Sequence, residues 1–194
     1  MERPHGTGEP ASAGSVAIEP VSLRLPDPPA ASSMTDTRDY RRALGSFATG
    51  ITIVTARAPD GRIAGVTANS FCSVSLDPPL VLVCVDHKAL SFPALRDHGR
   101  FAVNILRADQ EALSRRFATS KIVDKFEGVP HTISALGLPL VEGALAHLEC
   151  VTVSTHVEGD HTIFVGRVER AGVPGGEPLL YFKGRYERLP ESGA

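Results

Sequence analysis

Residues 65–86 of the chain read GVTANSFCSVSLDPPLVLVCVD, a polar half followed by a turn and an apolar run. The polar half gathers small hydroxyl and amide side chains close together, namely Thr67, Asn69, Ser70, Ser73 and Ser75. Burying such side chains costs free energy unless each finds a hydrogen-bond partner. The segment therefore either faces water on one side or holds a polar ligand.

The composition of the whole chain fits a globular domain without a surface for nucleic acid. The 194 residues suit one domain of ordinary size, and a hydrophobic fraction of 42% is enough for a core. The formal net charge of -2 gives no basic footprint, which argues against a nucleic-acid partner. The apolar run 80–85 has only the length of a strand, so no membrane partner is expected.

Three cysteines, Cys72, Cys84 and Cys150, show no CxxC spacing and no secretory signal precedes them. An odd number of cysteines in such a chain is typical of a reducing cytoplasm, where free thiols act as small core residues. The seven histidines do not follow a metal-ligand spacing, so no metal site is predicted.

Residues 1–36 differ in composition from the rest, being rich in Pro, Ala, Ser and Gly. Such a segment cannot bury enough apolar surface to offset the loss of chain entropy, so a disordered tail is predicted. The folded domain is expected to cover residues 37–190.

Within that domain the pattern predicts short strands with few helices. A first helix is capped by Asp36 or Thr37, and two more are capped by Ser91 and Asp109. The region 118–143 reads as irregular. The expected strands are 51–56, 63–66, 68–75, 80–85, 101–106, 146–157, 161–171, 179–182 and 186–189. Short links between them indicate antiparallel neighbours, and the whole favours a closed antiparallel barrel with helical additions.

The chain lacks the usual signatures of nucleotide-binding folds and hydrolases. It contains no GxGxxG turn, no P-loop and no GxSxG elbow. A dinucleotide, if one is used, is therefore not held by a Rossmann turn.

Six segments together resemble the flavin reductase family, which has the FMN-binding split-barrel fold. The matching segments, in the order of the family, are FATGITIVTA at 47–56, GVTANSFCSVSLDPPLVLVCVD at 65–86, FAVNIL at 101–106, LSRRFA at 113–118, GDHTIFVGRV at 159–168 and LLYFKGRYERL at 179–189. They cover nearly all of residues 38–189.

The resemblance implies a mainly β fold with helices, an antiparallel split barrel that forms a homodimer. It also implies an NAD(P)H:flavin oxidoreductase, in which a hydride passes from NADH or NADPH to FMN or FAD. The reduced flavin would then serve a separate monooxygenase. Such a reaction depends on stacking and alignment more than on a strong acid or base, which agrees with the lack of a catalytic triad.

The resemblance places the segment Thr67, Ala68, Asn69 and Ser70 beside the flavin ring. Small residues there let the backbone approach the ring edge and offer N–H donors. From residue types alone, an ordinary half-exposed strand explains these side chains more simply, and only the resemblance reverses this preference.

The phosphate end of the flavin is expected near the loop after the apolar run. Lys88 supplies positive charge, Ser91 lies at a predicted helix N-terminus and Ser73 adds a hydroxyl. Backbone groups of Cys84, Val85 and Asp86 would contact the ribityl chain. A solvated lysine and a plain N-cap are the alternatives for Lys88 and Ser91.

Further cofactor contacts are expected from residues outside the opening segment. Asn104, an amide within an apolar strand, either touches the cofactor or has a purely structural role. Phe117 lies with Arg115 and Arg116 on one helical turn that the family places near the flavin or the dimer contact. Thr49 and Gly50, at the end of the first helix, complete this group.

The turn Gly159-Asp160-His161 has good hairpin chemistry, and the family uses GDH for binding the nicotinamide nucleotide. His161 is the predicted catalytic residue, which orients the nicotinamide while Asp160 fixes the imidazole. Tyr186, with Tyr181 and Arg185, would close over the nicotinamide side.

Two other functions stay open at this point. One is a split-barrel flavoprotein that keeps FMN tightly bound and acts on another substrate; the other is a non-catalytic flavin-binding protein. The choice between NADH and NADPH is also open, since Arg57, Arg62 and Arg185 are all candidates for a contact to a ribose phosphate.

Overall fold

The computed structural model describes residues 36–190. The predicted tail lies outside these residues, except for Asp36. That residue is the N-cap of the first helix, where its carboxylate accepts a 2.9 Å hydrogen bond from the Arg38 amide. The three helices are α1 (Thr37–Gly45), α2 (Phe92–His98) and α3 (Glu111–Ala118).

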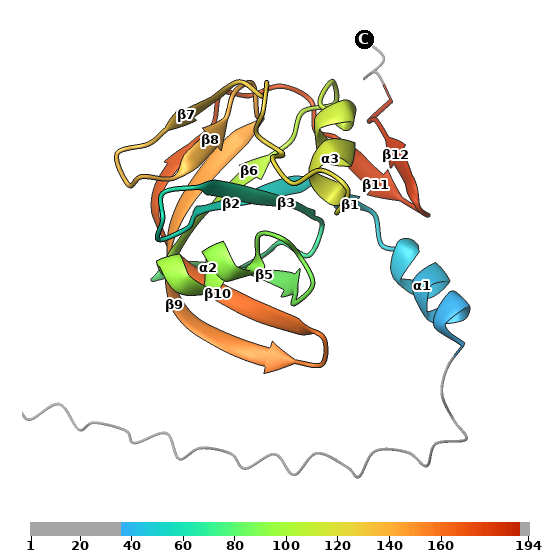
Figure 1. Ribbon diagram of the computed structural model, residues 1–194. Coiled ribbons are helices and arrows are strands. Elements are labelled where there is room, and N and C mark those ends of the chain that lie inside the picture. Colours follow the sequence, from blue (N-terminus) through green and yellow to red (C-terminus); the bar gives the residue numbers. More distant parts are fainter. Residues whose placement is uncertain (1–35, 191–194) are drawn as a thin grey trace, which may run out of the picture. The chain divides into compact units, whose positions relative to one another are not determined.

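Most of the regular secondary structure in the described chain is β-structure, which confirms the predicted fold class. The strands are β1 (Thr49–Gly50), β2 (Thr52–Arg57), β3 (Ile63–Ala68), β4 (Cys72–Leu76), β5 (Pro79–Asp86), β6 (Arg100–Ile105), β7 (His131–Ile133), β8 (Pro139–Val141), β9 (Ala146–Glu158), β10 (His161–Gly172), β11 (Leu180–Phe182) and β12 (Arg185–Glu187). Seven of them form one antiparallel sheet in the order β3-β2-β6-β9-β10-β5-β4, which curls into the barrel of Figure 1.

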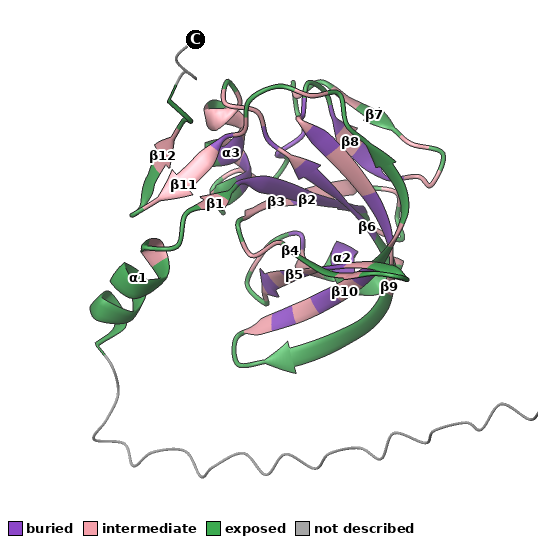
Figure 2. Cartoon of the chain, turned by 180° about the vertical axis from the view of Figure 1, so that it is seen from behind, coloured by how far each residue is buried: buried purple, intermediate pink, exposed green. Residues whose placement is uncertain are grey.

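The barrel interior is filled by one apolar cluster, and α2 closes it. Leu95 of α2 is 1% exposed and packs with Val83, Phe101 and Phe164, each of which is fully buried. Gly166 makes room for this packing, because a Cβ there would come within 2.5 Å of the Phe101 ring. Figure 2 shows the buried residues running along β2, β6 and β10.

A second apolar cluster joins α3 to the outside of β3 and β2. Phe117 is fully buried, and a Cβ at Gly65 would meet its ring at 2.7 Å. The Phe117 and Phe126 rings meet edge to face, with centroids 5.0 Å apart. This close approach fixes α3 against the end of β3.

Two local expectations were wrong, and a third was confirmed only in part. The predicted strand 68–75 is interrupted: β3 ends at Ala68, and a loop over residues 69–71 leads to β4. The third helix has Gln110 at its N-cap, while Asp109 pairs with Arg107 at 2.6 Å. Ser91 does precede α2, but its side chain makes no capping hydrogen bond. In addition, the irregular region contains the small hairpin β7–β8.

Helix α1 extends from the barrel and covers none of it. No residue of α1 is buried; Tyr40 and Leu44 of the helix and Phe47 just after it are 57%, 56% and 76% exposed. Tyr40 and Leu44, four positions apart, share one face of the helix, and with Phe47 they give the chain an exposed apolar face at this point.

Candidate functional site

A cavity of about 220 Å³ lies between the end of β3, the end of β5 and the start of β10. Its walls contain eight of the predicted site residues: Thr67, Ala68, Asn69, Ser70, Cys84, Val85, Asp86 and His161. The structure thus brings together residues that are up to 94 positions apart in the sequence. Val66 and Ala89 also line it and were missed, because apolar and small residues in a binding segment carry no signal of their own.

The sheet topology explains why a cavity forms here. β3 is one edge of the seven-stranded sheet, and β5 is paired with β4 only from Pro79 to Leu82. Within the described residues, the facing edges of β3 and of the last residues of β5 are therefore not joined by a ladder. Edge backbone carries free N–H and C=O groups, which suit the rim of a planar heterocycle such as a flavin.

The hydroxyl of Ser70 holds the loop after β3 to the edge of β5. It donates to the Cys84 carbonyl at 2.8 Å and accepts from the Cys84 amide at 3.1 Å. Its role is to set the width of the cavity, since both hydrogen-bonding directions of the hydroxyl are used within the chain.

Thr67 is tied to α3 on the other side of the loop. Its hydroxyl donates to the Ser114 carbonyl at 2.6 Å, and the Ser114 hydroxyl bonds the Tyr186 hydroxyl at 2.9 Å. The Tyr186 ring also lies under the Arg115 guanidinium, 4.6 Å from centroid to carbon. Tyr186 is thus linked to the cavity through Ser114 and does not line it.

His161 stands at the rim of the cavity with Asp160 beside it. Its Nδ1 lies 2.6 Å from an Asp160 carboxylate oxygen, and 43% of the His161 side chain is exposed. The hydrogen bond from His161, together with its charge, lowers the pKa of Asp160. A charged carboxylate at Nδ1 leaves Nε2 as the free end of the ring.

The residues that were predicted to bind the flavin phosphate do not all lie near the cavity. Lys88 is exposed on the loop after β5, where its amide donates to the Asp86 carboxylate at 2.8 Å. Ser91 is 1% exposed, and its hydroxyl has no partner among the described residues. Ser73 lies on β4 in register with Val81, well along β5 from the cavity. Neither serine lines the cavity.

Asn104 is a structural residue. It is fully buried, donates to the Ile53 carbonyl at 2.9 Å and to the Thr55 hydroxyl at 3.2 Å, and accepts from the Val141 amide at 2.9 Å. Its Oδ1 also lies 3.0 Å from Nδ1 of His147, which must donate because the oxygen is an acceptor. The amide has no capacity left for a cofactor.

Phe117, Thr49 and Gly50 also lie outside the cavity. Phe117 belongs to the second core cluster. Thr49 and Gly50 form β1, which pairs with β11 at Tyr181 and Leu180. Their predicted contact with a cofactor is therefore not seen in the arrangement of this single chain.

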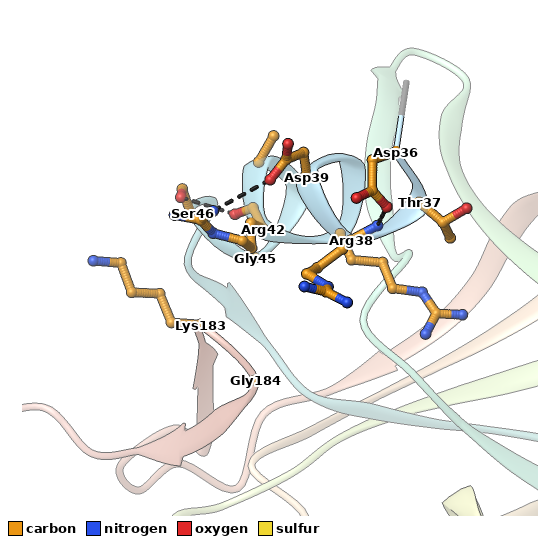
Figure 3. A pocket seen from close by; sticks show the side chains of 11 residues that line it. Asp36, Thr37, Arg38, Asp39, Arg42, Gly45, Ser46, Lys183 and Gly184 are labelled. Carbon is orange, nitrogen blue, oxygen red and sulfur yellow. Dashed lines mark hydrogen bonds and ion pairs between the residues drawn. The ribbon is translucent and has the colours of Figure 1, made fainter. Parts of the chain in front are cut away.

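A much larger hollow, of about 1140 Å³, is bounded by α1 and the turn between β11 and β12. Figure 3 shows it lined by charged side chains such as Arg38, Arg42 and Lys183 and by the ion pair of Arg42 with Asp39 at 3.2 Å. The candidate site is the smaller cavity, because it brings the predicted segment Thr67–Ser70 together with His161, whose Nδ1 bonds Asp160. Among residues 36–190, no group of three or more metal-ligating side chains is placed to hold an ion, and no helix is long and apolar enough to cross a membrane.

A family model and individual known proteins both match this chain in sequence. Residues 44–190 match the model of the flavin reductase like domain. The FMN reductase (NADH) SmoA of Agrobacterium fabrum is 44% identical over 154 residues, covering 79% of this chain and 87% of that protein. The reductase subunit HsaB of a flavin-dependent monooxygenase of Mycobacterium tuberculosis is 42% identical, covering 80% and 83%.

A solved structure agrees in fold as well as in sequence. The NADH:FAD oxidoreductase SgcE6 of Streptomyces globisporus, in complex with NAD and FAD fragments, superposes with a TM-score of 0.76 at 42% identity. The superposition covers 82% of this chain and 96% of the SgcE6 chain.

Proposed function

The chain belongs to the family of flavin reductase like domains, and from this premise we propose that it is an NAD(P)H-dependent flavin reductase. It takes a hydride from the nicotinamide and delivers it to FMN or FAD. The observation that carries the proposal is the cavity between β3, β5 and β10, where the polar segment Thr67–Ser70 and the pair Asp160–His161 meet.

The residues of the cavity fit a flavin. Val66, Ala68, Val85 and Ala89 give apolar walls, and the edges of β3 and β5 give backbone donors and acceptors. A bound flavin would supply the hydride-accepting ring, and the chain itself needs only to hold and align the reactants. Lys88, exposed on the loop after β5, is the proposed charge for the phosphate.

His161 is the proposed orienting residue for the nicotinamide. Its Nδ1 is engaged by Asp160, so Nε2 at the rim of the cavity is free to bond the carboxamide or a phosphate of the nucleotide. Asp160 fixes the ring by the same bond, in the manner of a carboxylate that orients a catalytic histidine.

NADH is the proposed donor. The relatives SmoA and SgcE6 are named for NADH. The candidate arginines for an extra ribose phosphate have other partners: Arg57 donates to the Gly61 carbonyl, Arg62 pairs with Asp60, and Arg185 lies 3.6 Å from Glu187. None of the three lines the cavity.

A flavin that enters and leaves as a substrate fits the size of the cavity. Pockets that enclose a small molecule usually measure about 300–1,000 Å³, and this one measures about 220 Å³. Part of the flavin would therefore be exposed. This favours a reductase that releases reduced flavin over a flavoprotein that retains it, and a separate monooxygenase is the proposed recipient, as for HsaB.

We also propose a homodimer, whose second subunit would cover the apolar face of Tyr40, Leu44 and Phe47. A cytoplasmic location is proposed as well, and it is supported by three cysteines that are all free. Size-exclusion chromatography with light scattering tests the dimer; a monomer at micromolar concentration would refute it.

The test of the function is a series of assays that crosses NADH and NADPH with FMN, FAD and riboflavin. Nucleotide oxidation that depends on added flavin, faster with NADH, is the expected result. No oxidation with any flavin would refute the proposal and leave a non-catalytic flavin-binding protein. A yellow cofactor that stays with the purified protein and does not exchange would favour the flavoprotein that acts on another substrate.

A further inference from the structure

We propose that His87 is a positioning residue that holds the turn carrying Asp160 and His161, and so sets the affinity for the nicotinamide nucleotide. The proposal rests on the proposed function and deepens it. His87 does not line the cavity, and nothing in the sequence distinguishes it from a surface histidine.

The contacts of His87 lie on both sides of His161. Its amide donates to the Asp160 carbonyl at 3.0 Å, and its Nε2 lies 3.0 Å from the Thr162 hydroxyl. One residue of the loop after β5 thus bonds the neighbours before and after His161.

These contacts lie at the end of the sheet, where the ladder hydrogen bonds of β10 stop before the turn. His161 is the first residue of β10 and the end of both of its ladders, paired with Asp86 on β5 and with Glu158 on β9. Gly159 and Asp160 lie beyond the ladders. The backbone bond from the His87 amide to the Asp160 carbonyl extends the connection between β5 and β10 by one residue, to the residue whose carboxylate orients His161.

The side chain of His87 is itself held in place. Its ring packs on Phe92 with centroids 5.0 Å apart, and Phe92 packs on the buried Phe164 at 6.1 Å. Its partner Thr162 is 4% exposed, so the hydroxyl of that residue would lose its bond if the imidazole were removed. The turn is therefore linked through His87 to the barrel core.

The two charged residues next to His87 in the sequence, Asp86 and Lys88, have contacts of a different kind. Lys88 lies close enough to Asp160 to contribute to the lowering of its pKa, but His161 is the main cause. Asp86 is engaged by the Lys88 amide. The side-chain link from the loop to the Thr162 hydroxyl is made by the imidazole of His87, in addition to the ladder that pairs Thr162 with Val85.

The experiment compares four variants of the full-length chain with the wild type. His87→Ala removes the imidazole, His87→Gln keeps a side-chain donor near the Thr162 hydroxyl, and Thr162→Val removes the partner while keeping its shape. His156→Ala is the matched control, an exposed histidine on β9 without a hydrogen bond to the turn. The measurements are KM for NADH, KM for the flavin, kcat, and amide hydrogen exchange over residues 157–165.

His87→Ala and Thr162→Val should each raise KM for NADH about three- to tenfold, the range that the loss of one hydrogen bond implies. Their flavin KM should stay within twofold of the wild type. Exchange over residues 158–162 should quicken, while His87→Gln and His156→Ala stay near the wild type in both measurements.

The proposal is overturned if His87→Ala leaves KM for NADH unchanged, if flavin KM rises as much as that for NADH, or if exchange over the turn does not change. Should His87→Ala fail to fold, Thr162→Val carries the same test, with His87→Gln as the variant expected to keep the wild-type values. An inactive wild type would refute the proposed function alone, because the exchange measurement still shows whether His87 holds the turn.

Discussion

Asn104 and His161 are both polar side chains on strands of the same sheet, and they are used in opposite ways. Asn104 is fully buried and makes four hydrogen bonds within the chain. His161 is about half exposed and has one side-chain partner, Asp160. The comparison teaches that a polar residue is available to a ligand when its hydrogen-bonding capacity is not used up inside the fold.

The largest expected effect is a loss of stability from Asn104→Leu. The change leaves the Ile53 carbonyl, the Val141 amide and the His147 ring without their partner in the interior. Each such group costs about 1–3 kcal/mol, so the free energy of unfolding should fall by about 3–5 kcal/mol and Tm by about 10 °C. Urea and thermal unfolding measure this.

Asn69→Leu is the matched control, because Asn69 is an exposed residue of the cavity wall. Its Tm should stay within about 2 °C of the wild type. An equal loss of stability in both asparagine variants would contradict the contrast between interior and site.

The second effect is a loss of activity without a loss of stability in His161→Ala. Misplacement of the nicotinamide should lower kcat/KM for NADH about ten- to a hundredfold. Tm should change by less than about 2 °C, because the side chain is half exposed and bonds only its neighbour. Steady-state kinetics of NADH oxidation and a thermal unfolding curve measure these two expected results. Unchanged kinetics would show that His161 does not orient the nicotinamide.

Ser70→Ala should lie between these two cases. It removes both hydrogen bonds to Cys84, which shape the cavity and also join the loop to β5. We expect KM for the flavin to rise about fivefold and Tm to fall by about 2–4 °C, which corresponds to about 1 kcal/mol. Ser154→Ala, an exposed serine on β9, is the control that should change neither quantity. A change in Tm alone would make Ser70 purely structural.

The smallest effect is a pH dependence of stability that comes from His147. Burial lowers its pKa, against an opposing influence of Glu149. Below the ordinary pKa of about 6.5, the unfolded chain binds a proton at His147 that the folded chain does not bind. The free energy of unfolding is therefore highest above this pH and decreases as the pH falls toward the lowered pKa of the folded state.

The wild type should therefore lose stability from about pH 6.5 downward, and His147→Gln should lose less. Urea unfolding at a series of pH values measures both slopes. Part of the dependence remains in the variant, because burial and the charges of Arg100 and Arg57 also lower the pKa of His98. Parallel curves for the two proteins would show that His147 is not responsible.

The fold class could be predicted from the sequence, because the alternation and the turn residues marked the strands. The wall of the cavity at Thr67–Ser70 could be predicted only with the family resemblance, since the residue types alone favoured an ordinary half-exposed strand. The break in the expected strand 68–75 could not be foreseen. It comes from a contact between Ser70 and Cys84, which are distant in sequence, and no local pattern encodes that contact.

Ser91 and Asn104 show the limit of the same reasoning at the site. Both are polar residues at positions where a ligand contact was plausible, and both are buried. Asn104 differs from His161 in burial and in the use of its hydrogen bonds, whereas Ser91 differs in burial alone, since its hydroxyl has no partner among the described residues. Burial of both depends on how β5, β6 and α2 pack. Resemblance to a family names the positions, but only the packing says which side chains reach the cavity.

The unpaired edges of β3 and β5 have a consequence for the folded sheet itself. Ladder hydrogen bonds are given up at this opening, although Ser70 bonds the amide and the carbonyl of Cys84, and the rest of an open edge is where a foreign strand can add. A flavin bound there would cover these edges for as long as it stays bound. The protein without flavin should therefore self-associate more readily than the protein with it.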